Sequence, residues 1–179
     1  MPKSPGSRRL HAFAAIALAL PLAAAAQTAT TNLGVSATVI KNCLVQATPV
    51  AFANYDPLIT TGNIDATGTV RIRCTRGTTI TSVALGNGTS TVVGTRSMAG
   101  PGTERLLYEL FKPSAATAGA ACNYTGASVW GDSGTGLFNP SGAAPTNLFR
   151  DYNVCGRLAL NQDVPAGSYA DTVTVTVNF

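Results

Sequence analysis

Apolar and polar residues alternate with a period of two along much of the chain after residue 26, and this pattern limits the possible folds more than any other feature. The alternation is clearest near the end of the sequence, where Val173, Val175, Val177 and Phe179 are separated by threonine or asparagine. A period of two places apolar side chains on one face of a β-strand. After residue 26 no segment keeps the period of 3.6 residues that an amphipathic helix requires. We therefore expect an all-β fold.

Seven short segments have the alternation or composition of strands, and glycine- or proline-containing turns separate them. They are residues 33–39, 69–74, 80–85, 91–93, 105–111, 154–160 and 169–179. Asn87-Gly88 lies between the third and fourth segments, and an Asn-Gly pair is typical of a tight β-hairpin. Residues 113–147 are rich in small residues and proline, and we expect them to form a long loop. This number of short strands predicts a single β-sandwich.

The first 26 residues have the composition of a secretory signal peptide. Three basic residues precede an apolar segment at residues 12–22, and the small residues Ala24 and Ala26 follow it. Signal peptidase requires such small residues, so we expect the exported chain to begin at Gln27. The apolar segment is shorter than the roughly 20 residues that a transmembrane helix needs. The protein is therefore expected to be exported and not to span a membrane.

Much of the net positive charge belongs to this leader. The sequence has 12 lysine and arginine residues against 8 aspartate and glutamate residues, and three of the basic residues lie in the predicted signal peptide. The rest of the chain is close to neutral and has no basic cluster that could follow a phosphate backbone. We therefore expect no nucleic-acid partner.

The four cysteines all follow the predicted leader, at Cys43, Cys74, Cys122 and Cys155. An even number of cysteines in an exported chain indicates disulfides, and four cysteines allow three connectivities. We expect the sequential pairs Cys43–Cys74 and Cys122–Cys155, because they would link neighbouring strands. A metal site is not expected, since no CxxC spacing and no histidine outside the leader supports one.

The residues needed for common catalytic mechanisms are missing from the expected mature chain. The single histidine of the sequence, His11, lies in the leader, so the expected mature chain has no histidine for a Ser-His-Asp or Cys-His arrangement. Two carboxylates could in principle hydrolyse a glycoside. We expect each candidate to have a structural role at a turn or strand edge instead: Glu104, Glu109, Asp132, Asp151, Asp163 and Asp171. Trp130 could stack on a carbohydrate, but a lone tryptophan more often anchors a core or loop. We expect no enzyme and no cofactor.

Several motifs in a fixed order carry a resemblance to a known family. They are Leu33-x-Val35-x-Ala37-x-Val39-x-x-x-Cys43, Val70-x-Ile72-x-Cys74, Leu107-Tyr108-Glu109-Leu110-Phe111, Trp130-Gly131-Asp132, Gly156-Arg157 with Gln162, and the ending from Ala166 to Phe179. With these motifs the chain resembles the spore coat protein U domain family, which includes subunits of archaic chaperone–usher pili. The resemblance extends over essentially the whole chain after the leader.

The resemblance implies an incomplete immunoglobulin-like β-sandwich at residues 41–179 that lacks its last strand. A hydrophobic acceptor groove would then lie beside the C-terminal strand, along Val173, Val175, Val177 and Phe179. A periplasmic chaperone would fill this groove first, and the N-terminal extension of the next subunit would replace it at an outer-membrane usher. The extension would be residues 27–40, with Leu33, Val35, Ala37 and Val39 as the donor strand.

Residues 33–39 and the last strand would each present an exposed edge, which soluble monomers normally avoid. The resemblance therefore predicts a structural pilus subunit that passes through the periplasm to the cell surface and supports adhesion or biofilm formation. Two alternatives remain at this point. Residues 33–39 could pair within their own domain in a secreted module that binds a glycan or surface. The protein could also be a coat or matrix protein.

Overall fold

The computed structural model describes residues 26–58, 62–89 and 95–179. The predicted signal peptide, apart from its last residue, and the predicted strand at residues 91–93 lie outside the described residues. The chain divides into two units, Met1–Ala37 and Thr38–Phe179, and each is described by itself. Within the first unit, residues 26–37 belong to no strand or helix.

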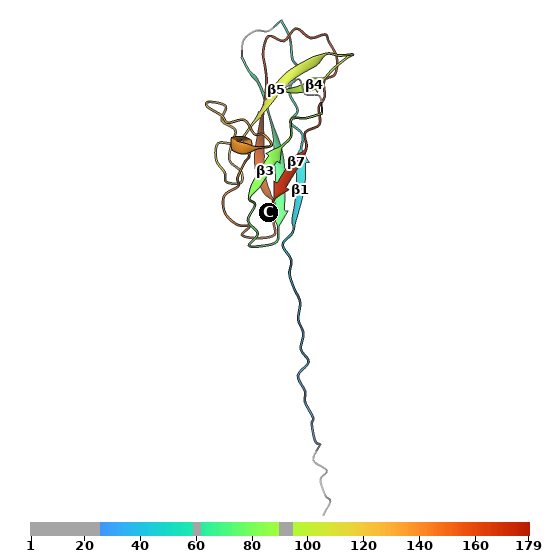
Figure 1. The fold of residues 1–179 in the computed structure, drawn as a ribbon, viewed down its shortest axis with the longest axis vertical. Helices are drawn as coiled ribbons and strands as arrows, with labels where there is room; N and C mark the ends of the chain where they lie inside the picture. Colours follow the sequence, from blue (N-terminus) through green and yellow to red (C-terminus); the bar gives the residue numbers. More distant parts are fainter. Residues whose placement is uncertain (1–25, 59–61, 90–94) are drawn as a thin grey trace, which may run out of the picture. The chain divides into compact units, whose positions relative to one another are not determined.

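The second unit consists of antiparallel strands, which confirms the all-β prediction (Figure 1). The strands are β1 (Cys43–Thr48), β2 (Ile64–Cys74), β3 (Ser82–Leu85), β4 (Arg96–Ala99), β5 (Arg105–Phe111), β6 (Arg150–Leu158) and β7 (Val175–Asn178), with a 3₁₀ turn at Gly134–Gly136. One sheet has the order β1-β2-β6-β5-β4, and the second contains β3 and β7. None of the helices described is long and apolar enough to cross a bilayer.

The core lies between the inner faces of these two sheets. In β2, Val70, Ile72 and Cys74 are buried, while Arg71 and Arg73 alternate with them on the other face. Inward residues of β5 and β6 and both strands of the smaller sheet join the same apolar cluster. Two sheets that share one core form a sandwich, because each sheet buries one face and leaves the other exposed to water.

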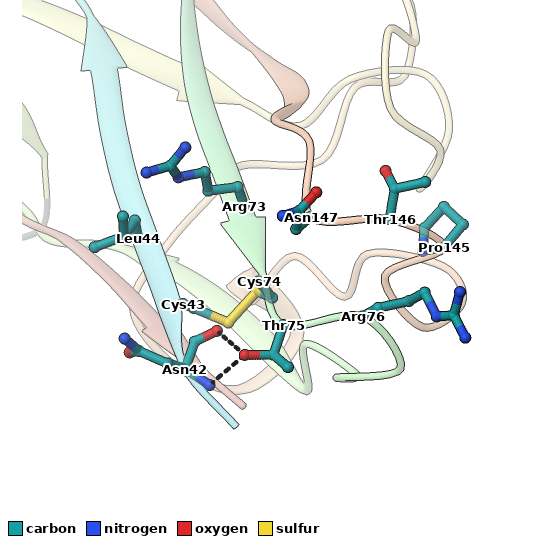
Figure 2. Close-up of a pocket in the computed structure, with 10 residues that line it drawn as sticks. All are labelled: Asn42, Cys43, Leu44, Arg73, Cys74, Thr75, Arg76, Pro145, Thr146 and Asn147. Carbon is teal, nitrogen blue, oxygen red and sulfur yellow. Dashed lines mark hydrogen bonds between the residues drawn. A yellow bond between two sulfur atoms is a disulfide. The ribbon is translucent and has the colours of Figure 1, made fainter. Parts of the chain in front are cut away.

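Both predicted disulfides are present. Cys43–Cys74 joins directly opposed residues of β1 and β2 and is drawn in Figure 2. Cys122–Cys155 ties the long excursion after β5 to the middle of β6. The predicted loop at residues 113–147 contains no strand and only the short 3₁₀ turn. Since all four sulfurs are bonded in pairs, none is available as a metal ligand.

The strand pairing includes features that the sequence pattern did not predict. β3 pairs with β7 in the register Ser82↔Asn178 to Leu85↔Val175. The partner expected for β3 in an Asn-Gly hairpin, residues 91–93, lies outside the described residues. β1 begins at Cys43, outside the strand segments predicted from the sequence.

The C-terminal strand is also shorter than residues 169–179. Ala170 forms a bridge to Ala99 at the edge of the large sheet, whereas β7 begins at Val175 and belongs to the small sheet. The segment therefore crosses from one sheet to the other, and the ladder is interrupted at the crossing.

Trp130 is a core residue, as expected from the sequence. Its side chain is fully buried, its indole nitrogen donates to the Val83 carbonyl oxygen at 2.9 Å, and its ring packs on Phe138. A ring in this position has no face available for a carbohydrate. Two of the acidic candidates are likewise structural, since Glu109 pairs with Arg96 and Asp151 pairs with Arg71.

Candidate strand-binding groove

β1 and β7 each have an edge without a ladder partner among the described strands, and both line the same hollow. β1 is an end strand of the large sheet, and β7 pairs with β3 in the small sheet. The two strands lie near each other in Figure 1. A groove of about 420 Å³ is lined by Ala47 and Thr48 from β1 and by Val173 and Val175 from the C-terminal segment. Its walls therefore offer unpaired backbone groups on both sides.

In the wall formed by β1, the side chains on the face that points toward the core are exposed to solvent. Val45 and Ala47 pair with Ile72 and Val70, so their side chains lie on the core face of the sheet. The two partners are almost fully buried, yet Val45 is 40% exposed and Ala47 is also exposed. No described element covers the core face of β1, so this part of the sandwich is open.

In the wall formed by the C-terminal segment, the apolar side chains are also partly exposed. Val173, Val175 and Val177 alternate with exposed threonines and are only half-buried, although they pack against the core cluster. The structure places Val173 and Val175 in the groove. Val177 lies on the same face of β7, and Phe179 follows the end of this strand and is 51% exposed.

The groove continues past the end of β1 into a second section of about 580 Å³. Val50, Phe52 and Tyr169 line both sections. Gly156 of β6 makes this floor possible, because a Cβ at that position would come within 2.8 Å of the Phe52 ring and still closer to Val50. An alanine at position 156 would force the floor away from the sheet.

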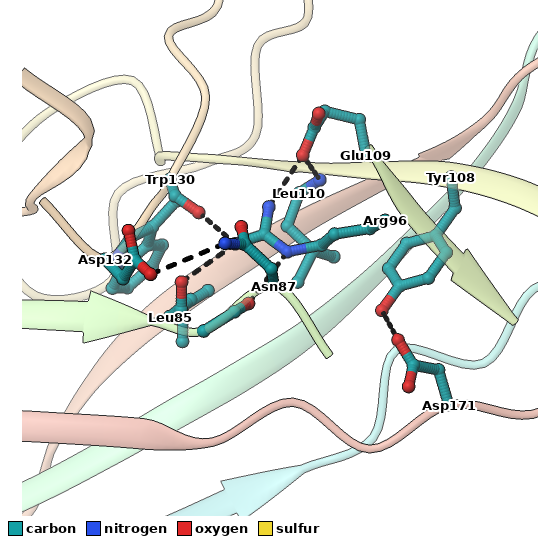
Figure 3. Close-up of polar contacts among 10 residues, drawn as sticks. Leu85, Asn87, Arg96, Tyr108, Glu109, Leu110, Trp130, Asp132 and Asp171 are labelled. Carbon is teal, nitrogen blue, oxygen red and sulfur yellow. Dashed lines mark hydrogen bonds and ion pairs between the residues drawn. The ribbon is translucent and has the colours of Figure 1, made fainter. Parts of the chain in front are cut away.

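Asp171 holds the C-terminal wall in place. One carboxylate oxygen accepts a hydrogen bond from the Tyr108 hydroxyl at 2.7 Å, as Figure 3 shows. The other accepts from the backbone nitrogens of Thr89 at 2.8 Å and Thr172 at 2.7 Å. Gly88 has φ +86° and lies so close to Asp171 that a Cβ would collide with the carboxylate. A short acidic side chain thus joins the wall to β5 and to the turn after β3.

These contacts change the acidity of both partners. Burial alone would raise the pKa of Asp171, but the hydrogen bonds from Tyr108, Thr89 and Thr172 outweigh it and hold the pKa below its ordinary value. Burial and the bond to Asp171 both raise the pKa of the Tyr108 phenol. The native state is therefore stabilised by the ionised form of Asp171.

We expect the groove wall to be acid-sensitive through Asp171. A carboxylate with a lowered native pKa contributes stability above its unfolded pKa of about 3.8, and this contribution is lost as the pH falls through the native value. Replacing Asp171→Asn should lower the melting temperature at pH 7 and flatten its dependence on pH below about 5. Asp163→Asn, at an exposed residue, is the control. Equal pH profiles for Asp171→Asn and the unchanged chain would contradict this role.

The predicted donor residues are the most exposed large apolar side chains of the N-terminal segment. Leu33 is 86% exposed and Val35 is 89% exposed, and Ala37 is also exposed. In the second unit, Val39 is 82% exposed and Ile40 73% exposed. No strand includes residues 33–39, since a strand requires a hydrogen-bonded partner.

The sequence predicted a groove along the C-terminal strand but not its floor. Val50 and Phe52 carry no periodic signal, because they follow β1 and belong to no strand. Tyr169 and Asp171 lie in the predicted segment 169–179, but the pattern assigns neither of them a contact with the groove. Gly156 was among the motif residues, and a glycine within a strand can indicate close approach of another segment.

Comparison with known proteins identifies a family and a similar solved structure. The model of the Spore Coat Protein U domain matches residues 29–176, which agrees with the resemblance drawn from the sequence motifs. No curated protein matches the chain.

A similar solved structure is the CsuC–CsuE chaperone-tip adhesion subunit pre-assembly complex from archaic chaperone-usher Csu pili of Acinetobacter baumannii. The matched chain is 28% identical, with a TM-score of 0.55, and the match covers 79% of the present chain and 41% of that chain. The present chain thus spans about two fifths of the length of the chain that it matches.

Proposed function

The chain belongs to the Spore Coat Protein U domain family, and on this basis we propose that it is a structural subunit of a surface pilus assembled by a chaperone–usher pathway. The observation that carries the proposal is the open groove between β1 and β7. Its two walls are strand edges, and the apolar faces of both walls are exposed in the isolated chain. A strand inserted between them would complete both sheets.

The proposed occupant in the pilus is the N-terminal extension, residues 27–40, of another copy. Leu33, Val35 and Val39 alternate with small or polar residues, so an extended segment presents them on one face. Burying each of the three would stabilise the junction by about 1.5–3 kcal/mol. Backbone hydrogen bonds to the edges of β1 and β7 would add to this, as in other cases of strand addition.

Before assembly the same groove would bind a periplasmic chaperone. The exposed apolar walls would otherwise invite irregular pairing between subunits. The similar chain belongs to a complex of a chaperone with a tip adhesion subunit, which supports this step by analogy. We propose that the subunit then passes to an outer-membrane usher and contributes at the cell surface to adhesion or biofilm formation. The role is structural, and no catalytic step belongs to it.

A charge placed in the groove should prevent assembly. Val175→Asp introduces a carboxylate on the inner face of β7, where an inserted strand would bury it without a partner. Thr176→Asp places the same charge on the exposed outer face of the same strand and is the matched control. In unheated denaturing electrophoresis, the Thr176→Asp chain should form a ladder of oligomers and the Val175→Asp chain should migrate as a monomer. Ladders of equal extent from both chains would contradict the proposal.

A further inference from the structure

The two ends of the Thr38–Phe179 domain expose charges of opposite sign. The basic end, where β2 finishes, contains Lys41, Arg73 and Arg76. The acidic end contains Asp56, Glu104 and Asp163, and the neighbouring Arg105 offsets one of these three negative charges. Of the six side chains that define the two ends, five are exposed, and that of Glu104 is half-buried. In the described part of the chain none of the six takes part in an ion pair.

The basic end surrounds the point where the chain enters the domain. Thr75 donates from its backbone nitrogen to the Asn42 carbonyl oxygen at 2.9 Å and from its hydroxyl to the Ile40 carbonyl oxygen at 3.1 Å. These contacts hold the start of the domain against the end of β2. Arg73 and Arg76 line a hollow of about 640 Å³ beside the disulfide that joins β1 to β2 (Figure 2).

The acidic end surrounds the second section of the groove. The Tyr55 hydroxyl accepts a hydrogen bond from the backbone nitrogen of Gln162 at 2.7 Å, which brings the segments of Asp56 and Asp163 together. The neighbours of both aspartates line this section. The two carboxylates therefore lie next to the mouth of the groove.

Glu104 reaches the same end from the turn between β4 and β5. Pro101 of this turn lies against Gly167, where an added Cβ would be 2.5 Å from the proline ring. Gly167 lines the second section of the groove. Three acidic side chains from three separate segments thus gather at one end of the sandwich.

The length of β2 separates the two ends. β2 has 11 residues, and a strand rises about 3.3 Å per residue, so Cys74 lies about 33 Å from Ile64. Ile64 pairs with Leu158, which lines the acidic-end section of the groove. The charges at the two ends are too far apart to interact within one molecule, since screening acts over about 8 Å at physiological salt.

The direction of the C-terminal segment determines which ends meet in a polymer. This segment runs from Tyr169, in the acidic-end section, to Asn178, which pairs with Ser82 after the turn at the basic end. A donor strand antiparallel to β7 would run the opposite way and emerge at the acidic end. Its own domain follows at once, beginning with the basic end around Lys41.

We infer that the basic end of one copy docks on the acidic end of the next, as a second, electrostatic contact beside the inserted strand. The inference rests on the proposed function, because it requires strand insertion between copies. A donor parallel to β7 would emerge at the basic end and bring two basic ends together. The charge distribution therefore favours one polarity, which gives a head-to-tail contact that does not close.

Charge reversal at either end should slow polymerisation. Arg76→Glu or Asp163→Lys in the exported chain should reduce the rate of growth roughly fivefold to tenfold at low salt, because steering of this kind changes association rates by tenfold or more. The difference should shrink at high salt, where the charges are screened. The chain with both reversals has the original net charge but should grow more slowly than either single variant, because each end then keeps at most one net charge. Growth is measured by light scattering and by unheated electrophoresis.

Two controls separate this contact from the strand itself. Lys112→Glu makes the same change in net charge as Arg76→Glu but lies away from both ends, next to Thr135, and should leave the rate unchanged. Val175→Asp should abolish growth at every salt concentration. If Arg76→Glu and Lys112→Glu grow equally fast, or if the double reversal grows as fast as the unchanged chain, the end-to-end contact is wrong while strand insertion stands. If the unchanged chain never polymerises, both proposals fail.

Discussion

Chains that lack residues 27–40 should form no polymer and yet keep a folded domain. The deletion removes the proposed donor residues Leu33, Val35, Ala37 and Val39, but it leaves β1 to β7 and both disulfides intact. The groove of such a chain can still accept a strand, so it should bind a chaperone or an added peptide of residues 27–40. Sedimentation and unheated electrophoresis measure the loss of oligomers, and circular dichroism measures the retained fold.

Point variants test whether polymerisation requires the apolar face of the extension or only its length. Val35→Asp places a charge on the face that would enter the groove, whereas Ser36→Asp places it on the opposite face. We expect the first to prevent polymerisation and the second to permit it. If deletion of residues 27–40 unfolds the isolated domain, the extension pairs within its own chain. That result would support a self-contained binding module.

Replacing Arg96→Met should destabilise the domain by about 3–5 kcal/mol, because it removes a buried guanidinium that pairs with a partly exposed carboxylate and also donates to three carbonyl oxygens. Arg96 is only 2% exposed, and its guanidinium donates to the Glu109 carboxylate at 2.6 Å. It also donates to the carbonyl oxygens of Leu85 at 2.9 Å and Trp130 at 2.7 Å (Figure 3), and to that of Gly86 at 3.0 Å. Methionine would leave all four acceptors without this donor.

The hydrogen bonds of the Arg96 side chain are expected to have this large effect on stability because they join the two sheets. Arg96 belongs to β4 of the large sheet, and Leu85 belongs to β3 of the small sheet and lines the groove. Denaturant unfolding should be measured in the chain without residues 27–40, so that polymerisation does not contribute. Arg105→Met is the control, since the Arg105 side chain is partly exposed and, among the residues that the structure describes, donates to the Glu104 carbonyl oxygen alone. A loss below about 1 kcal/mol for Arg96→Met would show that the network contributes little.

Local patterns in the sequence were enough to predict the strands whose two faces differ. β5 has the predicted bounds, and the predicted segment at residues 69–74 forms the second half of β2. In both, buried apolar residues alternate with partly exposed or charged ones. The disulfide pairs also followed from sequence order, because each joins strands or segments that lie side by side in the fold.

Features that depend on distant partners could not be predicted in this way. β3 is a fully buried strand without alternation, and its ladder partner β7 lies about 90 residues later in the chain. β1 has no alternation in burial, because its inner face is open to the groove. The groove floor at Val50 and Phe52 depends on the missing side chain of Gly156 in another strand. Neither residue carries a local signal of this contact.

The most direct test mixes two chains that are each unable to polymerise. The chain without residues 27–40 retains only the groove, and the Val175→Asp chain retains only a working extension. If the apolar face of residues 33–39 enters the groove of another molecule, the mixture should form a one-to-one complex that withstands denaturing electrophoresis until it is heated. Two separate monomers in the mixture, under conditions in which the unchanged chain forms ladders, would contradict the account.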